Sequence, residues 1–228
     1  MLAQTPGRNG SSRQVAGRAG PAMAPADTLA GVIDVVGAAI TFARNREIYG
    51  DGERADYVYK VVSGAVRTYK VLADGRRQIG AFYLPGDVFG LEVGDEHALA
   101  AEAVTEAKVL VVKRSALIGL ASRDSEIARE LWALMSRELA RGQARILLLV
   151  KTAQERVVGF LLEMAERRQT VDAVELPMSR QDIADYLGLT TETVSRTLTS
   201  LENDAAIALP NSRRILLRNP SALRRMIV

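Results

Sequence analysis

Three side chains in the C-terminal third of the chain carry complementary hydrogen-bonding chemistry. Glu192, Ser195 and Arg196 stand at positions i, i+3 and i+4, a spacing that places them together on one face of a helix. A carboxylate can accept a hydrogen bond from the cytosine amine, and a guanidinium can donate two hydrogen bonds to O6 and N7 of guanine. A hydroxyl can hydrogen-bond to several base edges. We therefore take these three residues as candidates for direct contacts to DNA bases.

Two short helices around a glycine are predicted to position these side chains. Ser179 can cap a first helix, with Asp182 reaching back from three residues later in a capping box. Gly188 supplies the permissive backbone of a tight turn, and Thr190 can cap a second helix. The pattern predicts a helix-turn-helix, and the alternative is a helical pair whose polar residues are only solvated. The buried stripe of the second helix is predicted from its apolar spacing: Val194, Leu198 and Leu201.

A pair of short strands is predicted after the second helix, over residues 207–209 and 215–217, joined by a Pro-Asn-Ser-Arg-Arg turn. This pattern is typical of a wing beside a helix-turn-helix. Cations at its tip suit phosphate contacts, which position a protein without reading sequence, and solvated surface arginines are the alternative. The residues predicted to contact the DNA backbone are Ser179, Arg180, Thr190, Thr191, Thr193, Thr199, Arg213 and Arg214.

Composition narrows the classes of function. The 228 residues are 48% hydrophobic, which is ordinary for a soluble globular protein of one large or two modest domains. No apolar run approaches the roughly 18 to 20 residues that cross a bilayer, and no secretory signal is visible, so a cytoplasmic location without membrane contact is expected. The chain has no cysteine and one histidine, and its net charge is only +3. We expect no cofactor, no metal site and no catalytic residues, and an enzyme is disfavoured.

The chain divides into four predicted segments in an α+β fold. Residues 1–26 are rich in small and polar types and are predicted to be disordered. Residues 27–123 are predicted to form an antiparallel β-roll, and turns at Ser63-Gly64 and Asp74-Gly75 are expected to form hairpins. Residues 124–151 are predicted to form a long helix, and 152–228 the DNA-binding domain, which opens with a second helix over about 153–168. The strand-like runs of the roll cover residues 57–63, 65–72, 78–84 and 107–112.

The long helix carries a stripe spaced 3, 4, 3, 4 and 3 residues apart, which is the a/d pattern of a two-helix seam. Gly142 lies within this stripe and would allow close approach of the two backbones. We predict that the helix pairs with its copy in a homodimer, and the alternative is that the same stripe packs on its own roll. The predicted seam consists of Trp132, Met135, Leu139, Gly142, Ile146 and Leu149.

The order of these parts resembles the CRP/FNR family of bacterial transcription regulators over roughly residues 30 to 220. The resemblance is carried by Val-Val-Ser-Gly-Ala-Val at 61–66, Leu-Pro-Gly-Asp-Val-Phe-Gly at 84–90, the long helix and the winged helix-turn-helix. It implies that the roll is a jelly roll of the cyclic-nucleotide-binding kind. The Glu-x-x-Ser-Arg pattern at 192–196 is similar to that of the FNR and FixK branch, which implies a TTGA-like half-site in an inverted repeat.

Cyclic nucleotide binding is not expected. Members of the family that bind the nucleotide use a Gly-Glu pair and an Arg-Ser or Arg-Thr pair, whereas here Gly90 is followed by Leu91. No lysine or arginine stands between Gln78 and Ala107, so a buried phosphate facing this segment would meet like charges, at a cost of roughly several kcal/mol. The acidic residues of the segment are Asp87, Glu92, Asp95, Glu96, Glu102 and Glu106.

Other sensory routes of the family are also disfavoured. Iron-sulfur sensing needs cysteines that are absent, and haem needs axial ligands, for which His97 is the one histidine available. We expect His97 to be a solvated side chain in an acidic loop. What remains resembles the FixK type, with the effector domain kept as a dimerisation scaffold and activity set by protein amount or by modification. The alternative is a sensor gated by an unknown small molecule in the roll.

The predicted mechanism is binding of palindromic double-stranded DNA by a homodimer. Its two recognition helices would stand about 34 Å apart and enter successive major grooves. By resemblance, the loops 169–175 and 94–98 contact RNA polymerase, which would make the protein an activator. The residues themselves do not distinguish an activator from a repressor.

Overall fold

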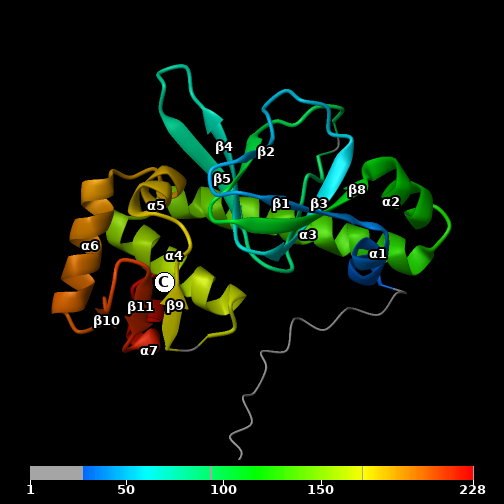
Figure 1. Ribbon diagram of the computed structural model, residues 1–228. Coiled ribbons are helices and arrows are strands. Elements are labelled where there is room, and N and C mark those ends of the chain that lie inside the picture. The colour runs from blue at the N-terminus through cyan, green and yellow to red at the C-terminus, as the bar shows by residue number, and fades with distance from the viewer. Residues whose placement is uncertain (1–27, 93, 171, 228) are drawn as a thin grey trace, which may run out of the picture.

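The computed structural model describes residues 28–92, 94–170 and 172–227. The segment 1–26, predicted to be disordered, lies outside these residues. Figure 1 shows a β-roll and a body of short helices, with the long helix α3 running from the α1 and α2 end of the roll towards α5. The order of elements confirms the α+β fold: a roll, a long helix and a C-terminal helix-turn-helix with a small sheet.

The roll consists of two four-stranded antiparallel sheets. One has the order β1 (Ala38–Phe42), β8 (Ala107–Lys113), β3 (Tyr57–Ser63) and β6 (Val88–Phe89). The other has the order β2 (Glu47–Tyr49), β7 (Ala100–Ala103), β4 (Val66–Val71) and β5 (Arg77–Tyr83). The four predicted runs correspond to β3, β4, β5 and β8. The other four strands have two to five residues, and the shortest of them are too short to show alternation.

The predicted hairpin at Ser63-Gly64 is wrong, because the strands on either side of it belong to different sheets. β3 pairs with β8 and β6, whereas β4 pairs with β5 and β7. Gly64, at φ 80°, crosses between the sheets where a Cβ would lie 2.1 Å from the carbonyl oxygen of Glu106. The hairpin at Asp74-Gly75 is confirmed, since β4 and β5 pair across it.

Two helices not predicted from the sequence flank the roll. α1 (Leu29–Val36) and α2 (Arg114–Ala121) precede and follow the strands. Both have eight residues, too few for a reliable helical period. Ile33 of α1 and Leu117 of α2 join a buried cluster with Val112 of β8 and Ile127 of α3. The two helices therefore close the end of the roll and anchor the start of α3.

Aromatic rings fill the interior of the roll. Tyr59 and Phe89 stack with ring centroids 5.0 Å apart, and Tyr83 stacks on Phe89 at 5.0 Å. His97, predicted to be solvated, is instead 1% exposed and lies 3.5 Å from the ring of Tyr49. The prediction fails because the backbone of His97 donates a hydrogen bond to Glu53 and accepts one from Gly52. The backbone of the neighbouring Glu96 pairs with that of Arg54 in an isolated antiparallel β-bridge. This short pairing turns Glu96 outwards and His97 inwards.

The long helix is confirmed as α3 (Ser125–Leu149), capped by Asp124, whose carboxylate accepts from the backbone of Glu126 and Ile127. Its roll-facing stripe is offset by one residue from the predicted seam. Trp132, Leu139 and Ile146 of the seam are 75%, 65% and 66% exposed, so these three side chains do not pack on their own roll. Side chains that contact the roll or α4 are Leu131, Leu134, Glu138, Arg141, Arg145 and Leu148.

The C-terminal body combines four helices with a three-stranded sheet. α4 (Ala153–Arg167) confirms the predicted second helix and opens with a capping box between Thr152 and Glu155. α5 (Arg180–Leu187), α6 (Thr191–Asn203) and α7 (Pro220–Arg225) follow. The wing strands are confirmed as β10 (Ile207–Ala208) and β11 (Arg214–Leu217), and β11 also pairs with an unpredicted strand, β9 (Ala173–Glu175).

One of the hydrophobic clusters spans the boundary between the roll and the C-terminal body. Ile79 and Phe82 of β5 belong to the same buried cluster as Phe160 of α4 and Tyr186 of α5. The ring centroids of Phe82 and Tyr186 lie 5.3 Å apart. The helix-turn-helix therefore packs directly on the roll of its own chain. Among the helices of the described residues, none is both long and apolar enough to cross a membrane.

Candidate nucleic-acid interface

The caps and the turn of the helix-turn-helix are as predicted. The side chain of Ser179 accepts from the backbone N–H of Asp182 at 3.1 Å, and the carboxylate of Asp182 accepts from the backbone of Ser179 at 3.0 Å. Gly188 ends α5 in the left-handed conformation at φ 63°. The hydroxyl of Thr190 then accepts from the backbone of Thr193 at 3.2 Å and starts α6. Local chemistry thus fixes where both helices begin and where the first one ends.

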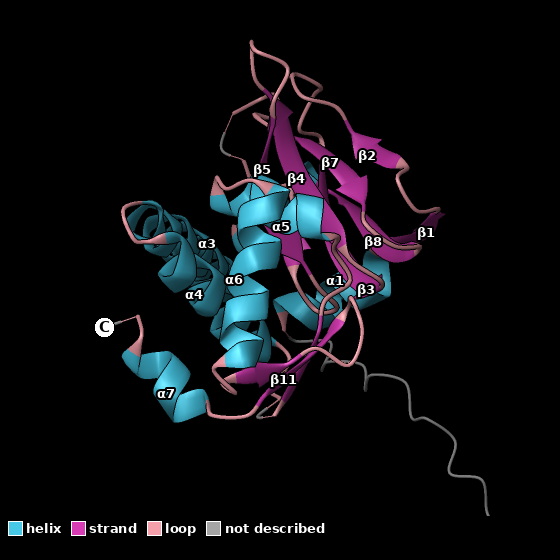
Figure 2. Ribbon diagram, turned by 90° about the vertical axis from the view of Figure 1, so that its left-hand side faces the viewer, coloured by secondary structure: helices cyan, strands magenta, loops and turns pink. Residues whose placement is uncertain are grey.

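One face of α6 is buried and the opposite face is open. Val194, Leu198 and Leu201 are at most 1% exposed, which confirms the predicted buried stripe. The three candidate base-contacting residues are all exposed, so the structure brings them together on the outer face of α6, the helix at the front of Figure 2: Glu192, Ser195 and Arg196. Their contact with bases stays a prediction.

Glu192 is held as a carboxylate. Its own backbone N–H, the hydroxyl of Thr190 and the charge of Arg196 lower its pKa, in that order of size. An ionised carboxylate only accepts hydrogen bonds, whereas the guanidinium of Arg196 only donates them. The outer face of α6 therefore offers an acceptor and a fork of donors side by side, which is the complement of a base pair edge in the major groove.

The residues predicted to contact the DNA backbone divide by exposure. Thr191 and Thr193 are half-buried, and their hydroxyls already bond Gln181 and Thr190. Arg180 is also half-buried, its pKa is lowered by burial, and its Nη1 atom has no hydrogen-bond partner among the described residues. The exposed members are Ser179, Thr190, Thr199, Arg213 and Arg214.

The wing tip presents two cations to solvent. The side-chain oxygen of Asn211 accepts from the backbone N–H groups of Arg213 at 2.9 Å and Arg214 at 2.8 Å. This turn holds the backbone while both arginine side chains stay exposed. Such an arrangement suits contacts to phosphates on either side of a groove.

Sequence reasoning missed a cluster of arginines where the roll meets α3 and α4. Segment 78–107 has no cation of its own, but Arg141, Arg145 and Arg167 line a cavity of about 180 Å³ beside it. Arg167 pairs with Asp87, Arg141 with Glu138, and Arg145 lies 4.9 Å over the ring of Tyr186. Arg141 and Arg145 stand four residues apart on α3, but no local pattern shows that Arg167 of α4 and the segment 78–107 of the roll lie beside them. The cavity adjoins a larger space of about 410 Å³ that the same three arginines also line, and this volume is within the roughly 300 to 1,000 Å³ usual for small-ligand sites.

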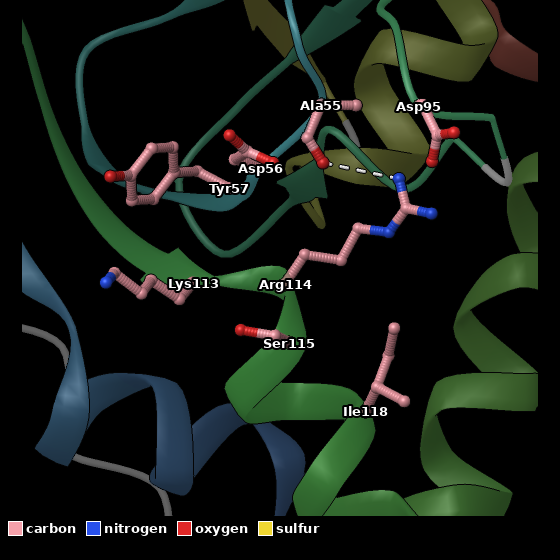
Figure 3. A pocket seen from close by; sticks show the side chains of 8 residues that line it. All are labelled: Ala55, Asp56, Tyr57, Asp95, Lys113, Arg114, Ser115 and Ile118. Atoms are coloured by element: carbon pink, nitrogen blue, oxygen red, sulfur yellow. Dashed lines mark hydrogen bonds between the residues drawn. The ribbon is translucent and has the colours of Figure 1, made fainter.

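A second hollow, of about 400 Å³, lies at the end of the roll beside α2 (Figure 3). Arg114 crosses it and donates to the carbonyl oxygens of Ala55 at 3.2 Å and of Gly94. Asp95, from the loop predicted to contact RNA polymerase, lines its rim together with Lys113. That loop is not uniformly exposed, since His97 within it is buried.

An open, polar helix face after a glycine turn, with a basic wing beside it, defines a winged helix-turn-helix DNA-binding protein. Each of the two domains of the chain matches a known domain family. Residues 155–226 match the Crp-like helix-turn-helix domain, and residues 39–124 match the cyclic nucleotide-binding domain.

Individual relatives indicate the branch of the family to which the chain belongs. It is 56% identical over 201 residues to the nitrogen fixation regulation protein FixK of Azorhizobium caulinodans, covering 86% of this chain and 81% of that protein. It is 45% identical to FixK of Rhizobium meliloti, covering 81% and 84%. The structure of FixK2 from Bradyrhizobium japonicum superposes with a TM-score of 0.81 at 51% identity, covering 85% of this chain and 98% of that one. The chain belongs to the CRP/FNR family of transcription regulators, in its FixK branch.

Membership of this family settles the broad function. The chain is a transcription regulator that binds DNA through its helix-turn-helix, and it is not an enzyme. The cyclic nucleotide-binding match describes the fold of the roll.

Proposed function

We propose that this regulator binds a TTGA-type inverted repeat as a homodimer, without cyclic nucleotide, and activates transcription. The observation that carries the proposal is the joint exposure of Glu192, Ser195 and Arg196 on the outer face of α6. Their pattern is the one that the FNR and FixK branch uses for this half-site. Arg196 would grip a guanine, and Glu192 and Ser195 would contact the neighbouring base edges.

The exposed seam of α3 supports the homodimer. A stripe of large apolar side chains along 25 helical residues is unusual on a monomer and typical of an association surface. A Cβ added at Gly142, within this stripe, would meet no described atom within 4 Å, so this face of α3 is open to a second helix. The proposal requires the two copies of α6 in this dimer to stand about 34 Å apart, one helical turn of DNA.

The interior of the roll supports independence from a cyclic nucleotide. Aromatic rings occupy the space between the two sheets, where Tyr49 stacks on His97 and Tyr59 stacks on Phe89. The arginines at the junction of the roll with α3 and α4 are engaged by carboxylates, a carbonyl and an aromatic ring. A sensor gated by another small molecule is the alternative, and a ligand-dependent change of DNA affinity would favour it.

Activation of transcription is supported by the names of relatives. The chain is 36% identical over 183 residues to the transcriptional activatory protein AadR of Rhodopseudomonas palustris. Contact with RNA polymerase would fall on the exposed parts of 94–98 and 169–175, such as Asp95 and Gln169. Because the target is chromosomal DNA, the proposal places the protein in the cytoplasm.

Substitution of Arg196 tests the proposal. We expect Arg196→Ala to reduce the preference for a TTGA palindrome over scrambled DNA by about 5- to 150-fold per half-site, which corresponds to about 1 to 3 kcal/mol for one base contact. Fluorescence anisotropy titrations at fixed salt measure this preference. Arg129→Ala is the matched control, because Arg129 is exposed on α3 and pairs with Glu126. Full retention of the preference by Arg196→Ala would show that the base-contact assignment is wrong.

A further inference from the structure

A buried ion-pair network joins the helix-turn-helix to the roll of the same chain. Arg67 of β4 donates from Nη1 to Oδ1 of Asp182 at 2.8 Å and from Nη2 to Oε1 of Glu102 at 2.8 Å. The side chains of Arg67 and Asp182 are 8% and 5% exposed. The partners lie 115 residues apart in the chain, so the network is a contact between domains. A charge buried this deeply destabilises the folded state unless it is paired, so the partners of this network depend on one another.

The next strand adds a second set of contacts to the same helix. Arg77 of β5 reaches Oδ1 of Asp182 at 2.6 Å and Oδ2 of Asp185 at 2.8 Å. Its neighbour Gln78 donates to the backbone carbonyl of Asp185 at 2.6 Å. The arms of the β4–β5 hairpin thus hold α5 through two guanidinium groups and one amide. Figure 2 shows α5 lying between these strands and α6.

The carboxylate of Asp182 both caps α5 and binds the two arginines of the roll. One oxygen of its carboxylate, Oδ2, accepts from the backbone and the hydroxyl of Ser179 and completes the capping box. The other, Oδ1, accepts from both arginines. Substitution of the arginines therefore removes the ion pairs to the roll and leaves the cap of α5 in place. The bond from Gln78 and the contact of Phe82 with Tyr186 also remain.

The position of α5 determines the position of the recognition helix. α6 follows α5 after a turn of three residues, Gly188 to Thr190, and the hydroxyl of Thr191 bonds the side chain of Gln181 at 2.6 Å. The two helices also pack on each other. A groove of about 860 Å³ separates the tip of the hairpin from the start of α6, so the hairpin holds the motif without covering its outer face.

We propose that Arg67 and Arg77 are positioning residues for DNA recognition, which fix the orientation of α6 relative to the roll in the absence of any ligand. The inference rests on the proposed dimer that binds an inverted repeat. Because α3 would join the two rolls, the contacts of Arg67 and Arg77 set the distance and angle between the two recognition helices. They determine the spacing of half-sites, whereas Arg196 determines which bases are read.

The test compares palindromes that differ only in their centre. DNA binding is measured for the best operator and for versions with one base pair added to or removed from its centre. The variant is Arg67→Gln with Arg77→Gln, and circular dichroism establishes that it is folded. Arg76→Gln is the matched control, since Arg76 stands on the same hairpin, is 77% exposed at its side chain and pairs only with Asp74 among the described residues.

We expect the double variant to lose about 5- to 150-fold of the preference for the correct spacing, the usual range of coupling between sites, and to keep its preference for TTGA over scrambled half-sites. Arg76→Gln should keep both preferences. If the double variant fails to fold, Arg77→Gln alone serves, because it leaves the bonds of Arg67 to Asp182 and Glu102 intact.

The outcomes separate the inference from the proposed function. A wild-type protein with no preference for an inverted repeat contradicts the proposed function itself. A wild-type protein that selects spacing, beside a folded variant that selects it equally well, overturns the role of Arg67 and Arg77. A folded variant that loses base preference together with spacing preference also overturns it, because the residues would then support the helix-turn-helix generally.

Discussion

Removing one seam side chain should weaken the dimer strongly. Leu139 stands in the middle of the exposed stripe of α3, and 65% of it is accessible in the single chain. In a pairing of two copies about a two-fold axis, both copies of Leu139 enter the interface near its centre. Leu139→Ala removes this contact without placing a charge on the helix, and alanine is the strongest helix former.

The size of the effect follows from the exposed fraction. Full burial of a leucine side chain stabilises by about 1.5 to 3 kcal/mol, so covering roughly two-thirds of it gives about 1 to 2 kcal/mol. Two copies in one dimer give about 2 to 4 kcal/mol. At about 1.4 kcal/mol for each factor of ten, the dimer dissociation constant should rise about 30- to 700-fold.

Sedimentation equilibrium over a range of protein concentrations measures this constant directly. Arg137→Ala is the control, because Arg137 is exposed on α3 outside both the seam and the roll-facing stripe. We expect the control to dimerise like the wild type. Equal dissociation constants for Leu139→Ala and the wild type, or a wild type that stays monomeric throughout, would refute the reasoning.

Two further predictions concern stability. Gly64→Ala should lower the free energy of unfolding by more than about 2 kcal/mol, because left-handed backbone costs an alanine about 1 to 2 kcal/mol and its Cβ would lie 2.1 Å from the oxygen of Glu106. An unchanged urea midpoint would contradict this. Gly75→Ala is the control that isolates the backbone cost, because its Cβ would meet no described atom within 4 Å. Burial raises the pKa of Tyr59 and Tyr186 from 10.0 to about 12. The folded state holds these protons more tightly than the unfolded chain. The two protonated phenols therefore make their full contribution to the free energy of unfolding below pH 10, and this contribution is lost as the pH rises through about 12. Unfolding titrations at about pH 9 and pH 11.5, with phenolate absorbance, check this, and ionisation of all tyrosines near pH 10 in the folded protein would count against it.

The sequence predicted those parts of the structure that depend on local chemistry. The capping box at Ser179, the left-handed turn at Gly188 and the cap at Thr190 each involve residues within a few positions of one another. The long helix was equally visible, because α3 has a capping aspartate and 25 residues without proline. For the same reason the candidate base contacts could be placed on one helix face.

Parts that depend on distant pairing could not be predicted. The bonds of Arg67 to Asp182 join a strand and a helix far apart in the chain, and neither side chain shows a distinguishing local pattern. His97 is buried because Glu53 and Gly52 pair with its backbone, a contact that no periodicity encodes. Gly64 resembles a hairpin glycine, but the strands on either side of it, β3 and β4, belong to different sheets and do not pair with each other.

Selection of bound sites from random double-stranded DNA, with the purified protein and no added ligand, tests the central claim most directly. We predict enrichment of a symmetric sequence with two TTGA-type half-sites in inverted orientation, at one fixed spacing. Enrichment of a single unrepeated half-site, or no enrichment until a small molecule is supplied, would contradict it.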